Sequence, residues 1–176
     1  VPIPGCSLIY PTGPSGFSSI CSNGGFYTVQ LDAKGQVASN ERIAPFFDTD
    51  KTPLFEKPAI IDGIAHFPTF SGNVQPIDLT GTVPVIGELW SLTSDEEREQ
   101  GWRPGGWQLN ETDDQGRMYI LMHPEGHNGT HKDGGPEVWV YDVAKRERVQ
   151  RIKLENWGVS LAVTTGTNPV SYRPLP

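Results

Sequence analysis

The sequence lacks the features that most directly indicate a function. Its 176 residues contain no run of about 18 apolar residues, the length that a membrane-spanning helix needs. They contain no Gly-x-Ser-x-Gly elbow, no Walker loop and no Cys-x-x-Cys pair, which mark serine hydrolases, phosphate-binding loops and thiol redox sites. Lysine and arginine number 14 against 21 aspartates and glutamates, for a formal charge of −7. This acidic balance argues against a nucleic-acid partner, because phosphates bind clustered basic residues, and we expect no membrane partner.

Long helical segments are also scarce, because glycine and proline interrupt the chain. The 20 glycines and 16 prolines are typical of many short strands joined by turns. Three times a short apolar run ends on an aspartate and enters a tight turn, at Asp32, Asp78 and Asp142. Recurrence at roughly 45–65 residues is about the period of a four-stranded propeller blade with loop insertions. We therefore predict an all-β fold with blade-like units at residues 6–48, 57–89 and 106–155, and the start of another at residues 158–165.

Three blades do not make a complete propeller. A blade buries its faces only against neighbouring blades, and known propellers have about four to eight of them. The first residues, Val1 to Pro4, include no initiator methionine, and residues 168–176 are rich in proline. We expect a partial β-propeller of about three to four blades, with both ends cut from a longer polypeptide.

One segment carries the signals of a helix. Thr93 or Ser94 can act as the N-cap, and Asp95, Glu96 and Glu97 follow at the positive end of the helix dipole. We predict a short inter-blade helix over residues 90–100. Because this segment is mostly polar, we expect it to lie on the surface between two blades.

The chain has two cysteines, Cys6 and Cys21, on runs that can pair across a loop rich in proline, glycine and serine. Spacing alone leaves two alternatives, a disulfide or two buried thiols. A disulfide would close a loop of about fifteen residues and would indicate an oxidising compartment such as a periplasm.

Three of the four histidines, His123, His127 and His131, follow each other at intervals of four residues. On a helix this spacing would align three imidazoles and suggest a metal site. The glycines and the proline in the same segment oppose a helix, so we interpret it as a polar loop. A metal-dependent hydrolase that uses these three histidines is the weaker alternative. His66 follows strand-like residues and precedes Phe67, which predicts a packed histidine.

The most distinctive segment contains Trp102, Arg103 and Trp107 within eight residues, together with close-approach glycines. One interpretation is a plug between blades, with the two indoles stacked under Arg103. The other is a contact patch for a partner, since tryptophan and arginine are enriched at binding hot spots. We therefore take these three residues as candidate subunit-interface residues.

Several long and unusually composed motifs resemble the heavy subunit of the quinoprotein amine dehydrogenases, that is, methylamine dehydrogenase and, more closely, aromatic amine dehydrogenase. The resemblance covers nearly the whole chain, from about Cys6 to about Thr164. The residues that carry it are Cys6 and Cys21, Trp102-Arg-Pro-Gly-Gly-Trp107, Met122-His-Pro-Glu-Gly126, Thr130-His-Lys132 and Glu137-Val-Trp-Val140.

The resemblance implies a periplasmic, seven-bladed β-propeller that pairs with a light subunit, as two heavy and two light chains. In this family a tryptophan tryptophylquinone built into the light subunit oxidises a primary amine to an aldehyde and ammonia. The electrons pass to a small blue copper protein. Cofactor and catalytic base belong to the light subunit, so the resemblance implies no catalytic, cofactor-binding or metal-binding residue in this chain. It also implies that Cys6 and Cys21 form a disulfide.

A second function stays open on the sequence alone. The same architecture would serve a periplasmic β-propeller that binds a partner but has no quinoprotein subunit, because propellers carry many unrelated functions.

Overall fold

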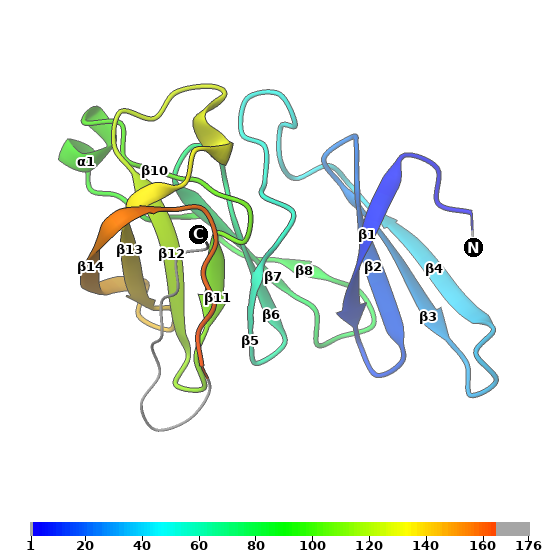
Figure 1. Cartoon of the computed structure of the whole chain (residues 1–176). Coiled ribbons are helices and arrows are strands. Elements are labelled where there is room, and N and C mark those ends of the chain that lie inside the picture. Colours follow the sequence, from blue (N-terminus) through cyan, green and yellow to red (C-terminus); the bar gives the residue numbers. More distant parts are fainter. Residues whose placement is uncertain (1, 165–176) are drawn as a thin grey trace.

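Three antiparallel sheets lie side by side along the chain, in sequence order (Figure 1). A computed structural model describes residues 2–164. The first sheet has the strand order β1-β2-β3-β4, and each strand pairs with the one before it. Its strands are β1 (Cys6–Thr12), β2 (Gly16–Cys21), β3 (Phe26–Leu31) and β4 (Val37–Ile43).

The second and third sheets repeat this arrangement, with one additional short strand each. The second sheet contains β5 (Ala59–Ile61), β6 (Ile64–Pro68), β7 (Asn73–Asp78), β8 (Val85–Ile86) and β9 (Trp90–Ser91). The third contains β10 (Arg103–Pro104), β11 (Asn110–Thr112), β12 (Arg117–His123), β13 (Gly135–Asp142) and β14 (Glu147–Gly158). The prediction of an all-β fold is confirmed for the described residues.

The three recurring aspartates begin turns of the same kind. Oδ1 of Asp32 and Oδ1 of Asp78 each accept the backbone N–H two residues further on, at 2.8 Å. Oδ1 of Asp142 accepts the N–H of Lys145 at 3.2 Å. When an aspartate carboxylate accepts a hydrogen bond from a backbone N–H two or three residues later, that bond takes the place of hydrogen bonds between strands, and the chain turns there. The repeated sequence signal therefore has one physical cause in all three sheets.

Two apolar clusters hold the sheets together. The cluster between the first and second sheets is aromatic at its centre: Tyr10 lies edge-on to Phe67 at 5.1 Å between ring centroids. Its buried members are Tyr10, Phe26, Leu54, Ala65, Phe67, Ile77 and Leu79. The cluster between the second and third sheets is larger and includes Val74, Trp90, Met118, Ile120, Trp139 and Tyr141. Each sheet thus contributes side chains to a core that it shares with its neighbour.

The predicted helix is shorter than expected. Only Asp95–Glu99 form α1, and Ser94 is its N-cap in a complete capping box with Glu97. Trp90 belongs to β9 instead, where it pairs with Val74 and packs against the ring of Tyr141 at 5.6 Å. Strand pairing and burial of this large side chain outweigh helix propensity at the start of the segment. Within residues 2–164, neither α1 nor the short 3₁₀ turn η1 (Thr130–Lys132) is long and apolar enough to span a membrane.

The third sheet and the residues after it also differ from the expected arrangement. The third unit was expected to begin at residue 106, but the first pairings of the third sheet fall on β10 and β11, and β10 lies before that residue. Residues 158–165 were expected to begin a new blade. In the described part of this segment, Ser160 forms an isolated parallel bridge with Gln108, and Leu161 donates its N–H to the Gln108 carbonyl at 2.9 Å. Residue 165 lies outside the described residues, and the new blade stays a prediction.

Cys6 and Cys21 form a disulfide between β1 and β2, where the two residues are directly opposite each other. The bond closes a loop with a sequence separation of 15. It ties the first strand, which lies at the edge of its sheet, to the strand inside it.

His66 is a buried, uncharged residue of the second sheet. Its side chain is 6% exposed, and burial lowers its pKa from 6.5 to about 4. The prediction of a packed histidine is confirmed, although Nδ1 has no hydrogen-bond partner among the residues that the structure describes.

Removing the disulfide is expected to destabilise the protein measurably. Replacement of both Cys6 and Cys21 by alanine should lower the free energy of unfolding by about 3 kcal/mol, because the unfolded chain regains the entropy of an open loop. Urea unfolding of the oxidised wild type and of the variant measures the difference. Under non-reducing conditions, mass spectrometry should find no alkylatable thiol; two alkylatable thiols would contradict the bond.

His66 should make stability fall in mild acid. The unfolded chain binds a proton on this side chain near pH 6.5 and the folded chain only near pH 4, so stability declines as the pH falls between these values. The contribution lost at pH 5 is about 2 kcal/mol relative to pH 8. His66→Leu should reduce the difference in unfolding free energy between pH 8 and pH 5 by that amount. The exposed His127→Leu is the control, and equal pH dependence in both variants would refute the assignment.

Candidate functional site

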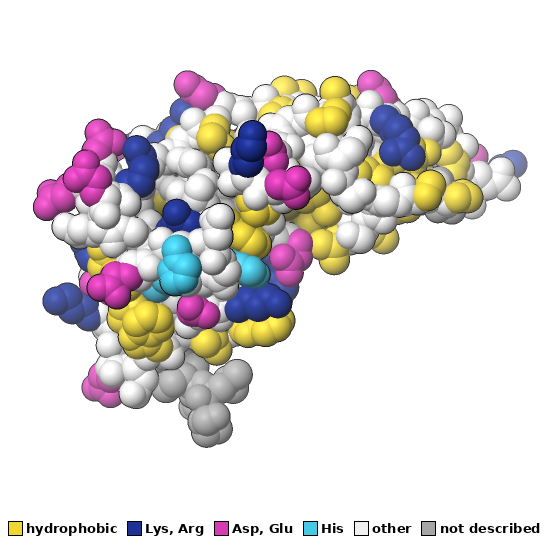
Figure 2. All heavy atoms as spheres, turned by 90° about the horizontal axis from the view of Figure 1, so that it is seen from above, with side chains coloured by type: hydrophobic (Ala, Val, Ile, Leu, Met, Phe, Trp, Pro, Cys, Tyr) yellow, Lys and Arg dark blue, Asp and Glu magenta, His cyan; other side chains and the backbone are white. Residues whose placement is uncertain are grey.

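The candidate residues lie at one end of the three sheets. The β2–β3, β4–β5, β6–β7 and β12–β13 connections all leave the sheets at the upper end in Figure 1, and β10 lies there too. We call this end the upper face. Figure 2 looks onto it and shows histidine side chains grouped over the third sheet, close to basic and apolar ones. The Trp102 segment and the histidine loop were predicted as separate segments. They are neighbours in the structure, because Arg103 pairs with His123.

Trp102 is half-buried and packs within the upper face. Its ring lies 5.1 Å from that of Trp139, and the Arg151 guanidinium lies over both rings, at 4.9 and 4.7 Å from their centroids. The cation stacked on this indole is therefore Arg151, whereas the sequence suggested Arg103. Trp102 therefore fits the first interpretation, in which the residue packs inside the protein, because its contacts hold the chain after α1 against the third sheet.

Charged groups complete this packing beneath α1. Glu97 contacts Arg148 at 2.7 Å and Arg151 at 3.3 Å, and Glu137 contacts Arg151 at 2.7 Å. Burial raises the pKa of the Glu97 carboxyl, but hydrogen bonds from Arg148 and the Ser94 backbone, with the two guanidinium charges, outweigh it and hold the pKa below its usual value. The two carboxylates stay ionised at neutral pH. This network fastens α1 to the sheet and has no exposed reactive group.

Arg103 is differently placed, at the side of a hollow in the upper face. In β10 it pairs with His123 of β12, and no ion pair or side-chain hydrogen bond in the described residues involves its guanidinium. The hollow has a volume of about 280 Å³, and Asp50, Phe70 and His131 also line it. Arg103 is therefore available to a partner from outside the described chain.

Trp107 is the exposed tryptophan of the predicted patch. Its side chain is 59% exposed, the Lys132 ammonium lies 5.4 Å from its ring centroid, and the Lys57 ammonium donates to its carbonyl at 3.0 Å. The backbone N–H of Trp107 donates to the carbonyl of Val159 at 2.7 Å, and the Val159 side chain is also exposed.

A further exposed tryptophan, Trp157, lies two residues before Val159 near the end of β14 and is 54% exposed. We call Trp107, Trp157 and Val159 the tryptophan patch. Exposed tryptophan of this extent is characteristic of surfaces that bind another protein. No local pattern in the sequence pointed to Trp157, because its exposure depends on where the long strand β14 ends.

The three histidines of the loop do not converge. Nε2 of His123 is buried against Oγ1 of Thr130 at 2.9 Å, while the ring of His131 stacks on Phe70 at 4.3 Å. His127 is exposed, with Nδ1 near the Glu125 carbonyl at 3.2 Å. Within residues 2–164, no group of three histidine, cysteine, aspartate or glutamate side chains is placed to hold a metal. The structure therefore uses His123 and His131 for packing and leaves His127 in solvent.

The accessible groups of the upper face suit binding. They are two exposed indoles, two lysine ammonium groups over or beside Trp107, and the Arg103 guanidinium, which has no ion pair within the described part of the chain. Such groups recognise a partner by apolar contact, stacking and charge. We find no nucleophile–base pair among the described residues of this face that would point to bond-making chemistry.

Comparison with known proteins identifies the family. The chain matches the family described as methylamine dehydrogenase heavy chain (MADH) over residues 1–174. Three similar proteins carry the name methylamine dehydrogenase heavy chain. That of Methylophilus methylotrophus is 26% identical over 172 residues, which cover 97% of this chain and 42% of the relative. That of Paracoccus versutus is 27% identical over 97% of this chain and 40% of its own length, and that of Methylorubrum extorquens is 25% identical over 98% and 42%.

The chain therefore spans about two fifths of the length of the curated relatives that it matches. Because the family match extends over almost every residue, the chain belongs to the methylamine dehydrogenase heavy chain family.

Proposed function

We propose that this chain is part of the heavy subunit of a periplasmic, tryptophan tryptophylquinone-dependent amine dehydrogenase. In this proposal the heavy subunit is not catalytic and positions the light subunit that carries the quinone. The holoenzyme contains two heavy and two light chains, oxidises primary amines to aldehyde and ammonia, and passes electrons to a blue copper protein. The observation that carries the proposal is the family match over residues 1–174.

The arrangement of the sheets supports a partial seven-bladed propeller. Three successive sheets pack through shared apolar clusters, as neighbouring blades do. Three blades of seven would account for about the 42% of the Methylophilus methylotrophus heavy chain that the match covers. The first sheet also has an aromatic outer side: Tyr27, on the opposite face from Phe26, is only partly buried, with Arg42 over its ring at 5.0 Å. A further blade would cover this side.

The disulfide supports the periplasmic location. Disulfides persist in oxidising compartments and are rare in the cytosol. The Cys6–Cys21 bond joins two strands of the first sheet. It can stabilise the fold only in a compartment where it stays oxidised. A periplasm meets this condition.

The tryptophan patch is the part of the chain that best fits a light-subunit contact. It combines two exposed indoles with Val159, and the lysines at Trp107 would complement an acidic partner surface. Arg103 lies on the same face, and its guanidinium has no ion pair within residues 2–164. Trp102, in contrast, is engaged by Trp139 and Arg151 within the chain.

Co-expression of the full heavy chain with its candidate light chain tests the function. We expect the two to co-purify, and the complex to reduce a redox dye when a primary amine is added. The heavy chain alone should show no amine-dependent dye reduction. Dye reduction by the heavy chain alone, or the absence of any light-chain complex, would contradict the proposal.

Trp107 and Trp102 form a matched pair for locating the contact. Trp107→Ala should weaken light-chain association about tenfold or more and change the melting temperature little, because its indole is exposed. Trp102→Ala should mainly lower the melting temperature, because it leaves a gap against Trp139 and Arg151. Titration of the light chain and thermal unfolding measure both effects. The opposite assignment of the two effects would show that Trp107 is a packing residue.

A further inference from the structure

Two asparagines of the chain are followed directly by glycine, Asn23 by Gly24 and Asn128 by Gly129. Such a pair can react within itself, because the backbone nitrogen of the glycine can attack the side-chain carbonyl carbon of the asparagine. Glycine has no Cβ to block the approach and adopts many backbone conformations. In a folded protein the reaction depends on how firmly the backbone of the pair is held. The two pairs differ in this respect.

Asn128 and Gly129 lie in the loop between β12 and β13, on the upper face, and both are exposed. Within residues 2–164, the Gly129 N–H and the Asn128 side chain form no hydrogen bond. A Cβ placed on Gly129 would meet no atom within 4 Å. The nitrogen and the amide therefore have room to approach each other, and water reaches both residues.

A turn of four residues holds this pair only at its flanks. The Thr130 N–H donates to the His127 carbonyl at 3.2 Å, which places Asn128 and Gly129 at the two central positions. Oγ1 of Thr130 donates to the same carbonyl at 2.9 Å and accepts the His127 N–H at 3.1 Å. Gly129 has a φ of 106°, which glycine adopts without strain. These bonds leave the peptide N–H between Asn128 and Gly129 unbonded.

Asn23 and Gly24, in the connection between β2 and β3, are held by several hydrogen bonds. Gly24 is buried, its N–H donates to the Cys21 carbonyl at 3.0 Å, and its carbonyl accepts the Phe46 N–H at 2.9 Å. Oδ1 of Asn23 accepts the N–H of Gly25 at 3.1 Å. Attack by the Gly24 nitrogen requires these bonds to open, and each one lowers the population of the reactive state. The same dipeptide is thus protected at this position.

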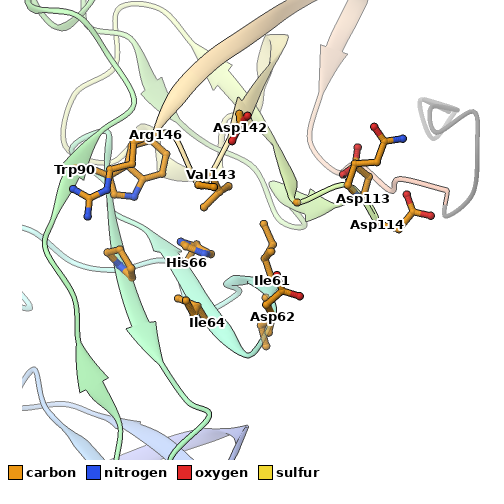
Figure 3. A pocket seen from close by; sticks show the side chains of 15 residues that line it. Ile61, Asp62, Ile64, His66, Trp90, Asp113, Asp114, Asp142, Val143 and Arg146 are labelled. Atoms are coloured by element: carbon orange, nitrogen blue, oxygen red, sulfur yellow. The ribbon is translucent and has the colours of Figure 1, made fainter.

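Aspartate before glycine reacts by the same route, and the β5–β6 turn, Asp62-Gly63, is such a pair. It lies at the lower end of the sheets, where the β5–β6, β11–β12 and β13–β14 turns enclose a cleft of about 720 Å³ between the second and third sheets (Figure 3). Pairing of Ile61 with Ile64 and a bond of 3.0 Å from the Leu79 N–H to the Gly63 carbonyl hold this turn. An aspartate has no amide, so reaction there releases no ammonia.

We propose that Asn128 is a site of spontaneous deamidation and isomerisation. The Gly129 nitrogen forms a bond to Cγ of Asn128, the bond from Cγ to Nδ2 breaks, and the proton of the backbone nitrogen leaves with the amide as ammonia. Water then opens the cyclic imide. Opening at Cγ gives aspartate, and opening at the main-chain carbonyl gives isoaspartate, in which the backbone runs through the former side chain. The reaction consumes one water and releases one ammonia, and needs no enzyme or cofactor.

The products change the upper face. Asn128 and Gly129 line the same hollow as Arg103, so either product places a new carboxylate at a hollow that contains a guanidinium. Isoaspartate also lengthens the backbone of the turn. The Thr130 hydroxyl of this turn contacts Nε2 of the buried His123 at 2.9 Å, so the change reaches the edge of the third sheet. The inference does not depend on the proposed light-subunit contact, and failure of one leaves the other standing.

Incubation of the complete heavy polypeptide in mildly alkaline buffer, followed by proteolysis and mass spectrometry, tests the site. We expect the peptide that contains Asn128 to gain the mass of the acid and to separate into an aspartate form and an isoaspartate form. In water enriched in heavy oxygen, both forms should carry the label. Conversion at Asn128 should be at least about tenfold faster than at Asn23, because the hydrogen bonds around Asn23 and Gly24 must open first.

Two variants and an unfolded sample provide the controls. Asn128→Gln keeps an exposed amide but forms the ring less readily, and should abolish most of the ammonia release. Asn23→Gln should leave that release unchanged. Unfolding in guanidinium chloride should bring the rates at Asn128 and Asn23 close together, because their difference lies in the fold. An Asn128 that stays intact, equal rates at the two sites in the folded protein, a rate difference that persists after unfolding, or undiminished ammonia release from Asn128→Gln would overturn the proposal.

Discussion

Each of the three described sheets is stabilised by an apolar core that it shares with the sheet beside it. Tyr10 and Phe26 of the first sheet meet Phe67 of the second, and Trp90 of the second meets Tyr141 of the third. A single sheet has no other way to bury such side chains, because its strands are short and its helices almost absent. The outer side of the first sheet is the exception, because in the described part of the chain no sheet covers Tyr27 and Arg42 lies over its ring. Stability of this kind depends on neighbours on both sides.

The constraint also decides where binding surfaces arise. Since the sheet faces are used for packing, the connections at the two ends remain for recognition. The upper end carries the tryptophan patch and Arg103, which forms no ion pair with any described residue, and the lower end carries the cleft that His66 lines. The groups exposed at these two ends differ in charge and in chemistry.

Features that depend on a few neighbouring residues could be predicted from the sequence. Features that depend on contacts between distant residues could not. The aspartate turns and the N-cap at Ser94 depend on a few neighbouring residues, and the structure contains them. The sequence overextended the helix to Trp90, because the pairing of this residue with Val74 is decided by tertiary contacts. The sequence alone could not show that Trp102 packs inside the chain while Trp107 is exposed. Arg151, which stacks on Trp102, is about fifty residues away in sequence. The cleft could not be foreseen, because three turns from two sheets form it.

The central claim is that these sheets are consecutive blades of a larger ring built by the heavy subunit. A crystal structure of the complete heavy polypeptide tests it most directly, at the outer side of the first sheet. The account predicts that another four-stranded sheet covers Tyr27 and Arg42 there, in the same way that the second sheet covers Tyr10 and Phe26. A complete polypeptide in which this side remains open to solvent would contradict it.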